Sequence, residues 1–226
     1  MRMRIVSAIA AAVIAAPAWA GLEDITNQEA VSGLKSALEK GSQAAVASLG
    51  KPDGFFGNSK VKIPLPDSLQ RAEKMMRQFG MGKYADELEL TMNRAAESAV
   101  PEAKQLFVDS VKKMSVQDAK GILTGGDTAG TEYFKRTTSD QLHARFLPIV
   151  KKATAKVKLA DKYNQYAEKG VAFGLVKKED ANLDEYVTRK ALDGLFVVVA
   201  DEEKKIRQNP VQAGSDLLKK VFGALK

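Results

Sequence analysis

"DEYVTRKALDGLFVVVADEEKKI" (residues 184–206) decides the fold, because it is the most apolar of the helical segments that the sequence predicts. Five of its apolar side chains recur three or four positions apart, which is the period of an α-helix: Leu192, Leu195, Phe196, Val199 and Ile206. Val197 and Val198 face the other way on such a helix. We therefore expect neighbouring helices on both sides of this segment and place it at the centre of the protein.

Most of the remaining chain also shows helical period, and we find no alternating strand pattern, internal repeat or low-complexity tract. Residues 51–66 are the exception, since their prolines and glycines predict a loop that Phe55, Phe56 and Ile63 attach to the core. We predict an all-α fold: a single compact multi-helix domain over residues 21–226, with about eight to ten helices around the central apolar helix.

Prolines and capping residues predict where several helices begin and end. Ser115 and Asp118 have the spacing of a capping box and predict the start of a short helix. A long helix is expected after Thr138, with a bend at Pro148, because proline removes a backbone donor. Tyr163 belongs either to the continuation of that helix or to a separate short helix.

The first twenty residues, "MRMRIVSAIAAAVIAAPAWA", have the features of a secretory signal peptide. Arg2 and Arg4 precede an apolar run, and Ala18-Trp19-Ala20 is a small-x-small cleavage pattern. The apolar run is shorter than the roughly 20 residues of a membrane-spanning helix, so a retained anchor is the weaker alternative. We expect cleavage after Ala20 and a periplasmic protein.

Composition excludes several classes of function. The chain contains no cysteine, which removes disulfides, thiolate metal sites and the lipid-modified cysteine of a lipoprotein. Its formal net charge is +7, but the lysines are spread over several predicted helices. A nucleic-acid binder usually concentrates such charge in one stripe with interleaved aromatic residues. We therefore expect no nucleic acid as a partner, while weak contact with an anionic membrane surface stays open.

Three stretches together resemble one family of exported bacterial proteins. They are "DELELTMNRAAE" (86–97), "GGDTAGTEYFKRTT" (125–138) and "LDEYVTRKALDGLFVVVADEEKKIRQNP" (183–210). The chain resembles the domain of unknown function 4197 family over essentially all of its length after the signal peptide. This resemblance implies an exported helical protein and supplies no activity or substrate. Many members look like lipoproteins with an N-terminal cysteine, so their membrane tethering does not carry over to this chain.

The glycine-rich start of the second stretch is a candidate ligand-binding site. Backbone donors at a helix N-terminus attract anions, and a basic side chain lies nearby in sequence. The candidate residues are Gly125, Gly126, Asp127, Thr128 and Arg136. The preferred interpretation is structural: either glycine supplies a left-handed cap for the preceding helix, and either Asp127 or Thr128 caps the next. The stretch also lacks the lysine followed by serine or threonine that a nucleotide-binding P-loop needs.

Glu203 is the second candidate, because helical projection puts its carboxylate inside the apolar stripe of the central helix. A buried carboxylate could act as an acid, a base or a ligand group. The preferred interpretation is that Glu203 lies in a solvated last turn and pairs locally with Arg207. Arg189 and Asp193 are similar but weaker candidates.

No recognisable catalytic or metal motif accompanies these residues. His143 is the only histidine, and Asp140 precedes it by three positions, but a metal site needs three or four ligands. There is no Gly-x-Ser-x-Gly nucleophile elbow and no acidic calcium loop. We therefore expect no metal and no cofactor.

The sequence favours a non-catalytic protein of the bacterial envelope that binds a ligand or partner, either an unidentified small molecule or an envelope protein. One alternative is an envelope-acting hydrolase that uses carboxylates and hydroxyls from residues 127–136 together with Glu203. Another is a membrane-surface protein attached through a C-terminal amphipathic helix, residues 211–226, although such a short helix more often packs on its own core.

Overall fold

The computed structural model describes residues 27–174 and 176–209, and helices form most of these ranges. The elements follow in this order: α1 (Asn27–Leu49), α2 (Asp67–Gln78), α3 (Gly82–Ala99), the 3-10 helix η1 (Val100–Glu102), α4 (Ala103–Lys113), α5 (Val116–Thr124), α6 (Ala129–Thr154), α7 (Lys158–Ala172), the 3-10 helix η2 (Lys178–Asp180) and α8 (Leu183–Gln208). These ranges contain no strand, which confirms the all-α prediction. The predicted signal peptide (1–20) and C-terminal helix (211–226) lie outside the described residues.

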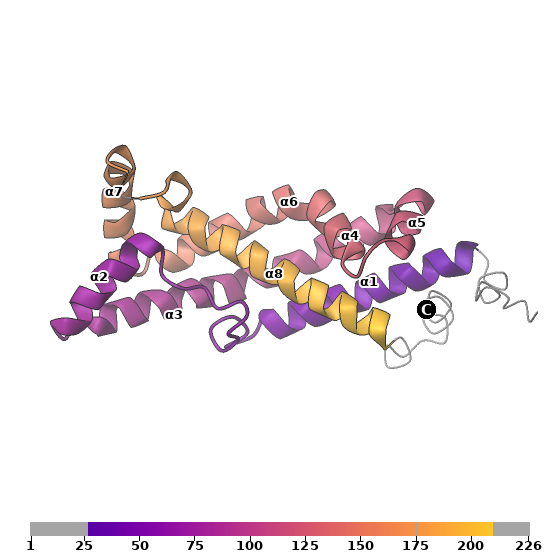
Figure 1. Cartoon of the computed structure of the whole chain (residues 1–226), viewed down its shortest axis with the longest axis horizontal. Helices are drawn as coiled ribbons and strands as arrows, with labels where there is room; N and C mark the ends of the chain where they lie inside the picture. Colours follow the sequence, from indigo (N-terminus) through magenta and orange to yellow (C-terminus); the bar gives the residue numbers. More distant parts are fainter. Residues whose placement is uncertain (1–26, 175, 210–226) are drawn as a thin grey trace, which may run out of the picture.

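The longer helices α1, α3, α6 and α8 run roughly along one long axis, and α7 stands across it (Figure 1). α2 and α7 lie at one end, which we call the α2/α7 end; α5 and the start of α1 lie at the other, which we call the α1/α5 end. α6 and α8 run antiparallel between the two ends and pack together. The last turn of α8 therefore meets the first turn of α6 at the α1/α5 end.

α8 has the position that the opening stretch predicts, since it packs against α1, α3, α6 and α7. Its predicted stripe is buried, apart from Ile206, which is partly exposed. Val198 is also buried, so neighbours do cover part of the second side. The prediction was wrong for Val197, which is 43% exposed, because it lies one turn after the exposed Asp193 on the side that faces solvent.

α6 is longer than expected. It begins at Ala129 and continues through Pro148 to Thr154, so the helix predicted to follow Thr138 is only the second half of one element. No proline interrupts the segment before Pro148, and its buried side chains keep one period throughout. Tyr163 lies on a separate helix, α7, which was one of the two alternatives. The short helix α5 has Ser115 as its N-cap residue and has the predicted capping box with Asp118.

Candidate functional site

Glu203 is a buried carboxylate at the α1/α5 end. The residue is 7% exposed, so the preferred expectation of a solvated last turn was wrong and the alternative from the helical projection is confirmed. The N–H of Gly130 donates to its Oε1 at 2.9 Å, and the N–H of Thr131 donates to its Oε2 at 2.8 Å. The Thr131 hydroxyl donates to Oε2 as well. A side chain of α8 therefore binds the free donors that begin α6.

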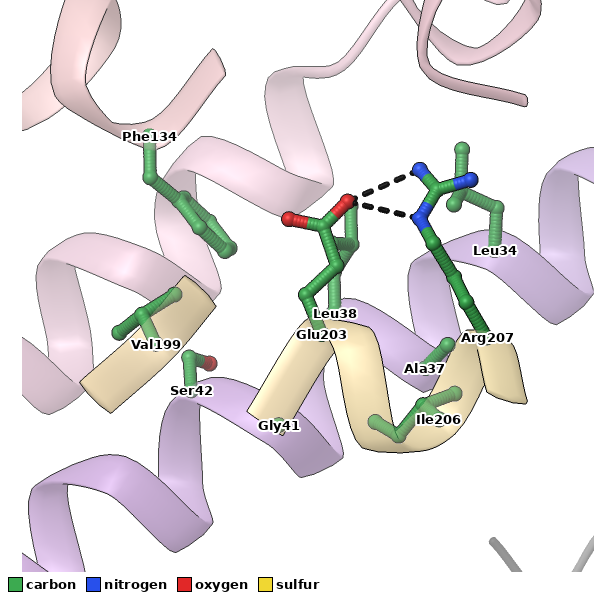
Figure 2. Close-up of a pocket in the computed structure, with 10 residues that line it drawn as sticks. All are labelled: Leu34, Ala37, Leu38, Gly41, Ser42, Phe134, Val199, Glu203, Ile206 and Arg207. Atoms are coloured by element: carbon green, nitrogen blue, oxygen red, sulfur yellow. Dashed lines mark hydrogen bonds and ion pairs between the residues drawn. The ribbon is translucent and has the colours of Figure 1, made fainter. Parts of the chain in front are cut away.

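Arg207, one turn after Glu203, supplies the positive charge, as the local pairing predicts. Its Nε and Nη2 donate to Oε1 of Glu203 at 3.0 and 2.8 Å (Figure 2). Nη2 also donates to the backbone oxygen of Ile122 in α5. Both side chains are about nine-tenths buried or more, and a buried pair is retained only when further hydrogen bonds satisfy it. This ion pair therefore connects α5, α6 and α8.

Little space remains around this pair. α1 covers it with Leu34, Leu38 and neighbouring residues, and the cavity between them measures ≈ 10 Å³, about the space of one water molecule (Figure 2). Gly130 allows α1 and α8 to approach the first turn of α6 closely. A Cβ at this position would lie 2.4 Å from Cδ2 of Leu38 and 3.0 Å from Oε1 of Glu203. The first turn of α6 thus accepts an anion, and this anion belongs to the protein itself.

The glycine-rich stretch before α6 has a different geometry from the one predicted. Gly125 has an extended backbone, and neither Gly125 nor Gly126 has the left-handed conformation, so the predicted left-handed cap was wrong. The N-cap of α6 is Thr128, but the side chain of Thr128 itself makes no capping hydrogen bond. Since Glu203 already binds the first-turn donors, Asp127 and Thr128 are not needed as caps. Arg136 points elsewhere and pairs with Asp118 at 3.1 Å.

A second buried carboxylate, Glu97 on α3, was missed by sequence reasoning. Its Oε1 accepts from the N–H groups of Phe55 and Phe56, and its Oε2 accepts from Arg94. One turn earlier, Asn93 makes two hydrogen bonds with the backbone of Ile63. These contacts attach the predicted loop to α3. The available signal was a carboxylate inside the run "AAESAV" (95–100), whose apolar residues are all buried.

A shallow groove between α6 and α8 contains the weaker candidates. His143 Nε2 lies 2.8 Å from Oε2 of Glu185, and both side chains are 42% exposed. The partner of His143 is therefore Glu185 on α8, and Asp140, which precedes His143 in the sequence, is exposed. Arg189 pairs with Asp180 rather than with groove residues, while Asp193 lines the groove. Within the described ranges no three His, Asp or Glu side chains are grouped so that they could hold a metal ion.

A cleft of ≈ 600 Å³ opens at the α2/α7 end. α2 contributes Asp67, Ser68 and Leu69 to its wall; α7 contributes the set Tyr163, Tyr166, Ala167 and Gly170; the following segment contributes Gly174, Val176, Lys177 and Asp180. Most of this lining is apolar. The volume lies in the range of ordinary small-molecule sites, which is about 300–1,000 Å³.

Tyr163 fixes the floor of this cleft. Its hydroxyl donates to the backbone oxygen of Asp180 at 2.6 Å and lies 3.1 Å from Oγ of Ser68. Burial raises the pKa of the Tyr163 hydroxyl, so the group stays neutral in the folded protein at ordinary pH. Sequence reasoning missed the site, although tyrosines followed by Ala167 and Gly170 at helical spacing indicate a face with large and small side chains.

The fold and the sites together define the class of this protein, which is an all-α protein of one domain. Its two buried glutamates, Glu97 and Glu203, accept hydrogen bonds from backbone N–H groups, and its open cleft lies between α2 and α7. The chain belongs to the family described as "Protein of unknown function (DUF4197)", whose model matches residues 24–223, and this confirms the resemblance seen in the sequence. No curated protein and no solved structure matched the chain. Among the described helices, none is long and apolar enough to cross a membrane.

Proposed function

We propose that this chain is an exported protein of the bacterial envelope that is non-catalytic and binds a small amphipathic molecule in the cleft between α2 and α7. The observation that carries the proposal is the cleft itself, with ≈ 600 Å³ of space and mostly apolar walls. Ligand sites usually combine such walls with a few polar groups that orient the ligand. Here those groups are the hydroxyls of Ser68 and Tyr163 and the Asp67–Lys177 ion pair.

Non-catalytic binding is favoured over carboxylate hydrolysis by the surroundings of Glu203. Its two oxygens accept five hydrogen bonds, all from groups of the protein. A general acid or base needs a lone pair or proton within reach of a substrate, and a cavity of ≈ 10 Å³ admits none. The hydrolase alternative also needs a second carboxylate that faces the same opening, and Glu97 is instead bound to the loop at Phe55.

Ligand binding can be tested with the fluorescent probe 8-anilinonaphthalene-1-sulfonate, which combines aromatic rings with an anionic group. Tyr166→Ser removes a ring at the rim of the cleft, and since Tyr166 is 68% exposed we expect the fold to survive. The probe affinity should fall about tenfold, which corresponds to about 1.4 kcal/mol. Val116→Ser is the control, because Val116 is also exposed but does not line the cleft.

Two outcomes would contradict the proposal. Equal probe binding by the Tyr166 and Val116 variants would place the probe outside the cleft. Native mass spectrometry of protein purified from its own periplasm should show a co-purified small molecule, on a chain that begins at Gly21. A clean apo chain from that compartment would count against a tightly bound ligand.

A further inference from the structure

Exposed apolar side chains are concentrated where α2 turns into α3. The described ranges expose nine large hydrophobic residues, and four of them fall within ten consecutive positions: Met75, Phe79, Met81 and Tyr84. Phe79 is 72% exposed. Single exposed apolar residues need no explanation, but a cluster of this kind marks an interaction surface. We call residues 75–84 the hairpin tip.

Four backbone N–H groups at the turn of the hairpin tip have partners within the protein. Gly80 has a φ of +71° and makes the sharp turn after α2. The N–H groups of Phe79, Gly80, Met81 and Tyr84 all donate to backbone oxygens within the tip or the last turn of α2. Moving a peptide N–H out of water is costly unless it has a partner. The tip can therefore enter an apolar medium without leaving these donors unpaired.

Basic residues accompany the apolar side chains of the tip. The stretch from 74 to 84, "KMMRQFGMGKY", contains Lys74, Arg77 and Lys83 and no acidic residue. Arg77 already pairs with Glu73 and Asp86 from its flanks. Lys74 and Lys83 are exposed, and Lys83 Nζ lies 5.2 Å from the centre of the Tyr84 ring. The tip thus presents aromatic and methionine side chains beside two lysines.

We propose that the hairpin tip docks onto an anionic lipid surface. Phe79 and Met81 enter the boundary between headgroups and acyl chains, and Lys74 and Lys83 remain among the headgroups. Aromatic side chains and snorkelling lysines are typical of this boundary. The contact is peripheral, it differs from the one predicted for residues 211–226, and it does not depend on the cleft.

A lipid surface fits the tip better than a protein partner does. The turn between α2 and α3 lies at the extreme end of the long axis, so it is convex (Figure 1). Four partly exposed side chains supply on the order of 450 Å² of apolar surface, about half of the 800 Å² per partner in a standard protein interface. A small convex tip cannot bury more against a rigid surface, whereas lipids close around it.

Flotation of the chain from Gly21 onward with vesicles tests this proposal. We expect binding to vesicles of phosphatidylethanolamine and phosphatidylglycerol (3:1) and much weaker binding to pure phosphatidylcholine. The double variant Phe79→Gln/Met81→Gln should lose at least tenfold in partition. The double variant Lys74→Gln/Lys83→Gln should lose the preference for anionic lipid, and its binding to vesicles should no longer depend on salt concentration. The matched control is Leu90→Gln/Val116→Gln, which changes two exposed apolar residues outside the tip.

A fluorescence measurement supplies the depth of insertion. The sequence has one tryptophan, Trp19, inside the predicted signal peptide, so in the chain from Gly21 onward Phe79→Trp introduces a single reporter that can be compared with Val116→Trp. Brominated lipid should quench the first and leave the second unchanged. Equal partition of the tip and control variants would overturn the proposal. So would a dimer in solution that Phe79→Gln dissociates without vesicle binding, since the tip would then contact a second copy.

Discussion

At the α1/α5 end, a buried carboxylate is surrounded by donors and only ≈ 10 Å³ remains empty, whereas at the α2/α7 end a cleft of ≈ 600 Å³ stays open beside exposed apolar side chains. Both ends belong to the same chain. They differ in what surrounds the polar groups: Glu203 meets backbone donors and Arg207 in a closed core, while Tyr163 meets one backbone oxygen and the Ser68 hydroxyl in the wall of an open cleft.

This difference separates stability from recognition. The Glu203 carboxylate cannot also bind a ligand, because its two oxygens already accept five hydrogen bonds from the protein. Apolar surface that stays exposed to water contributes nothing to the free energy of unfolding. The stability of the chain therefore comes from buried apolar surface such as the packed core of α1, α6 and α8. We therefore expect substitutions at the α1/α5 end to change the free energy of unfolding, and exposed substitutions at the α2/α7 end to change binding.

The largest expected effect is from Glu203→Ala. This change leaves the α6 donors and the Arg207 guanidinium buried without their partner, and breaking a buried pair in this way costs about 3–5 kcal/mol. Urea unfolding monitored by circular dichroism measures the loss. Glu202→Ala is the control, because Glu202 is the preceding residue and pairs with an exposed lysine, Lys205; it should cost less than about 1 kcal/mol. Equal losses of unfolding free energy at the two positions would mean that the buried hydrogen bonds of Glu203 stabilise the protein no more than an exposed ion pair does.

Gly130 and Gly121 form a second matched pair at the same end. Gly130→Ala places a Cβ against Leu38 and Glu203, and such overpacking should cost about 1–3 kcal/mol. Gly121 is exposed in α5 and a Cβ there meets nothing within 4 Å, so Gly121→Ala should stabilise the protein by about 0.5–1 kcal/mol. Thermal unfolding of the two variants should therefore shift in opposite directions, and shifts of the same sign would contradict the close approach at Gly130.

Most of the helices could be predicted because helix formation depends on local periodicity. The central position of α8 and the start of α5 follow from spacing within a few turns. The exposure of Val197 could not be predicted in the same way. A valine beside a buried stripe has the same local sequence pattern whether or not a neighbouring helix covers it. The number of turns in α6 was underestimated because Thr138 looks like a boundary when its buried contacts are unknown.

The candidate site illustrates the limit of local reasoning. The sequence singled out both Glu203 and the stretch that starts α6, but these are 73 positions apart, and no local pattern joins them. The capping partner of α6 was therefore sought in Asp127 and Thr128. The cleft was harder still to predict, because it depends on how far apart α2 and α7 lie in the folded protein, and no local pattern encodes that distance.

The smallest expected effect concerns Tyr186, which joins α8 to the loop near the α2/α7 end. Its hydroxyl donates to the backbone oxygen of Pro64 at 3.0 Å, and burial raises its pKa from 10.0 to about 12. The raised pKa means that the neutral hydroxyl stabilises the fold. This contribution is complete below pH 10 and is lost as the pH rises from 10 towards 12.

Comparison with Tyr186→Phe isolates this contribution, because phenylalanine does not titrate. At pH 8 the variant should be less stable than the parent by about 1 kcal/mol, the value of one hydrogen bond. At pH 11 the parent alone should have lost about 1.4 kcal/mol, so the difference should vanish or reverse. Urea unfolding at both values measures it. A difference that stays constant from pH 8 to pH 11 would mean that Tyr186 ionises as freely as in the unfolded chain, and that water already reaches this side of the α2/α7 end.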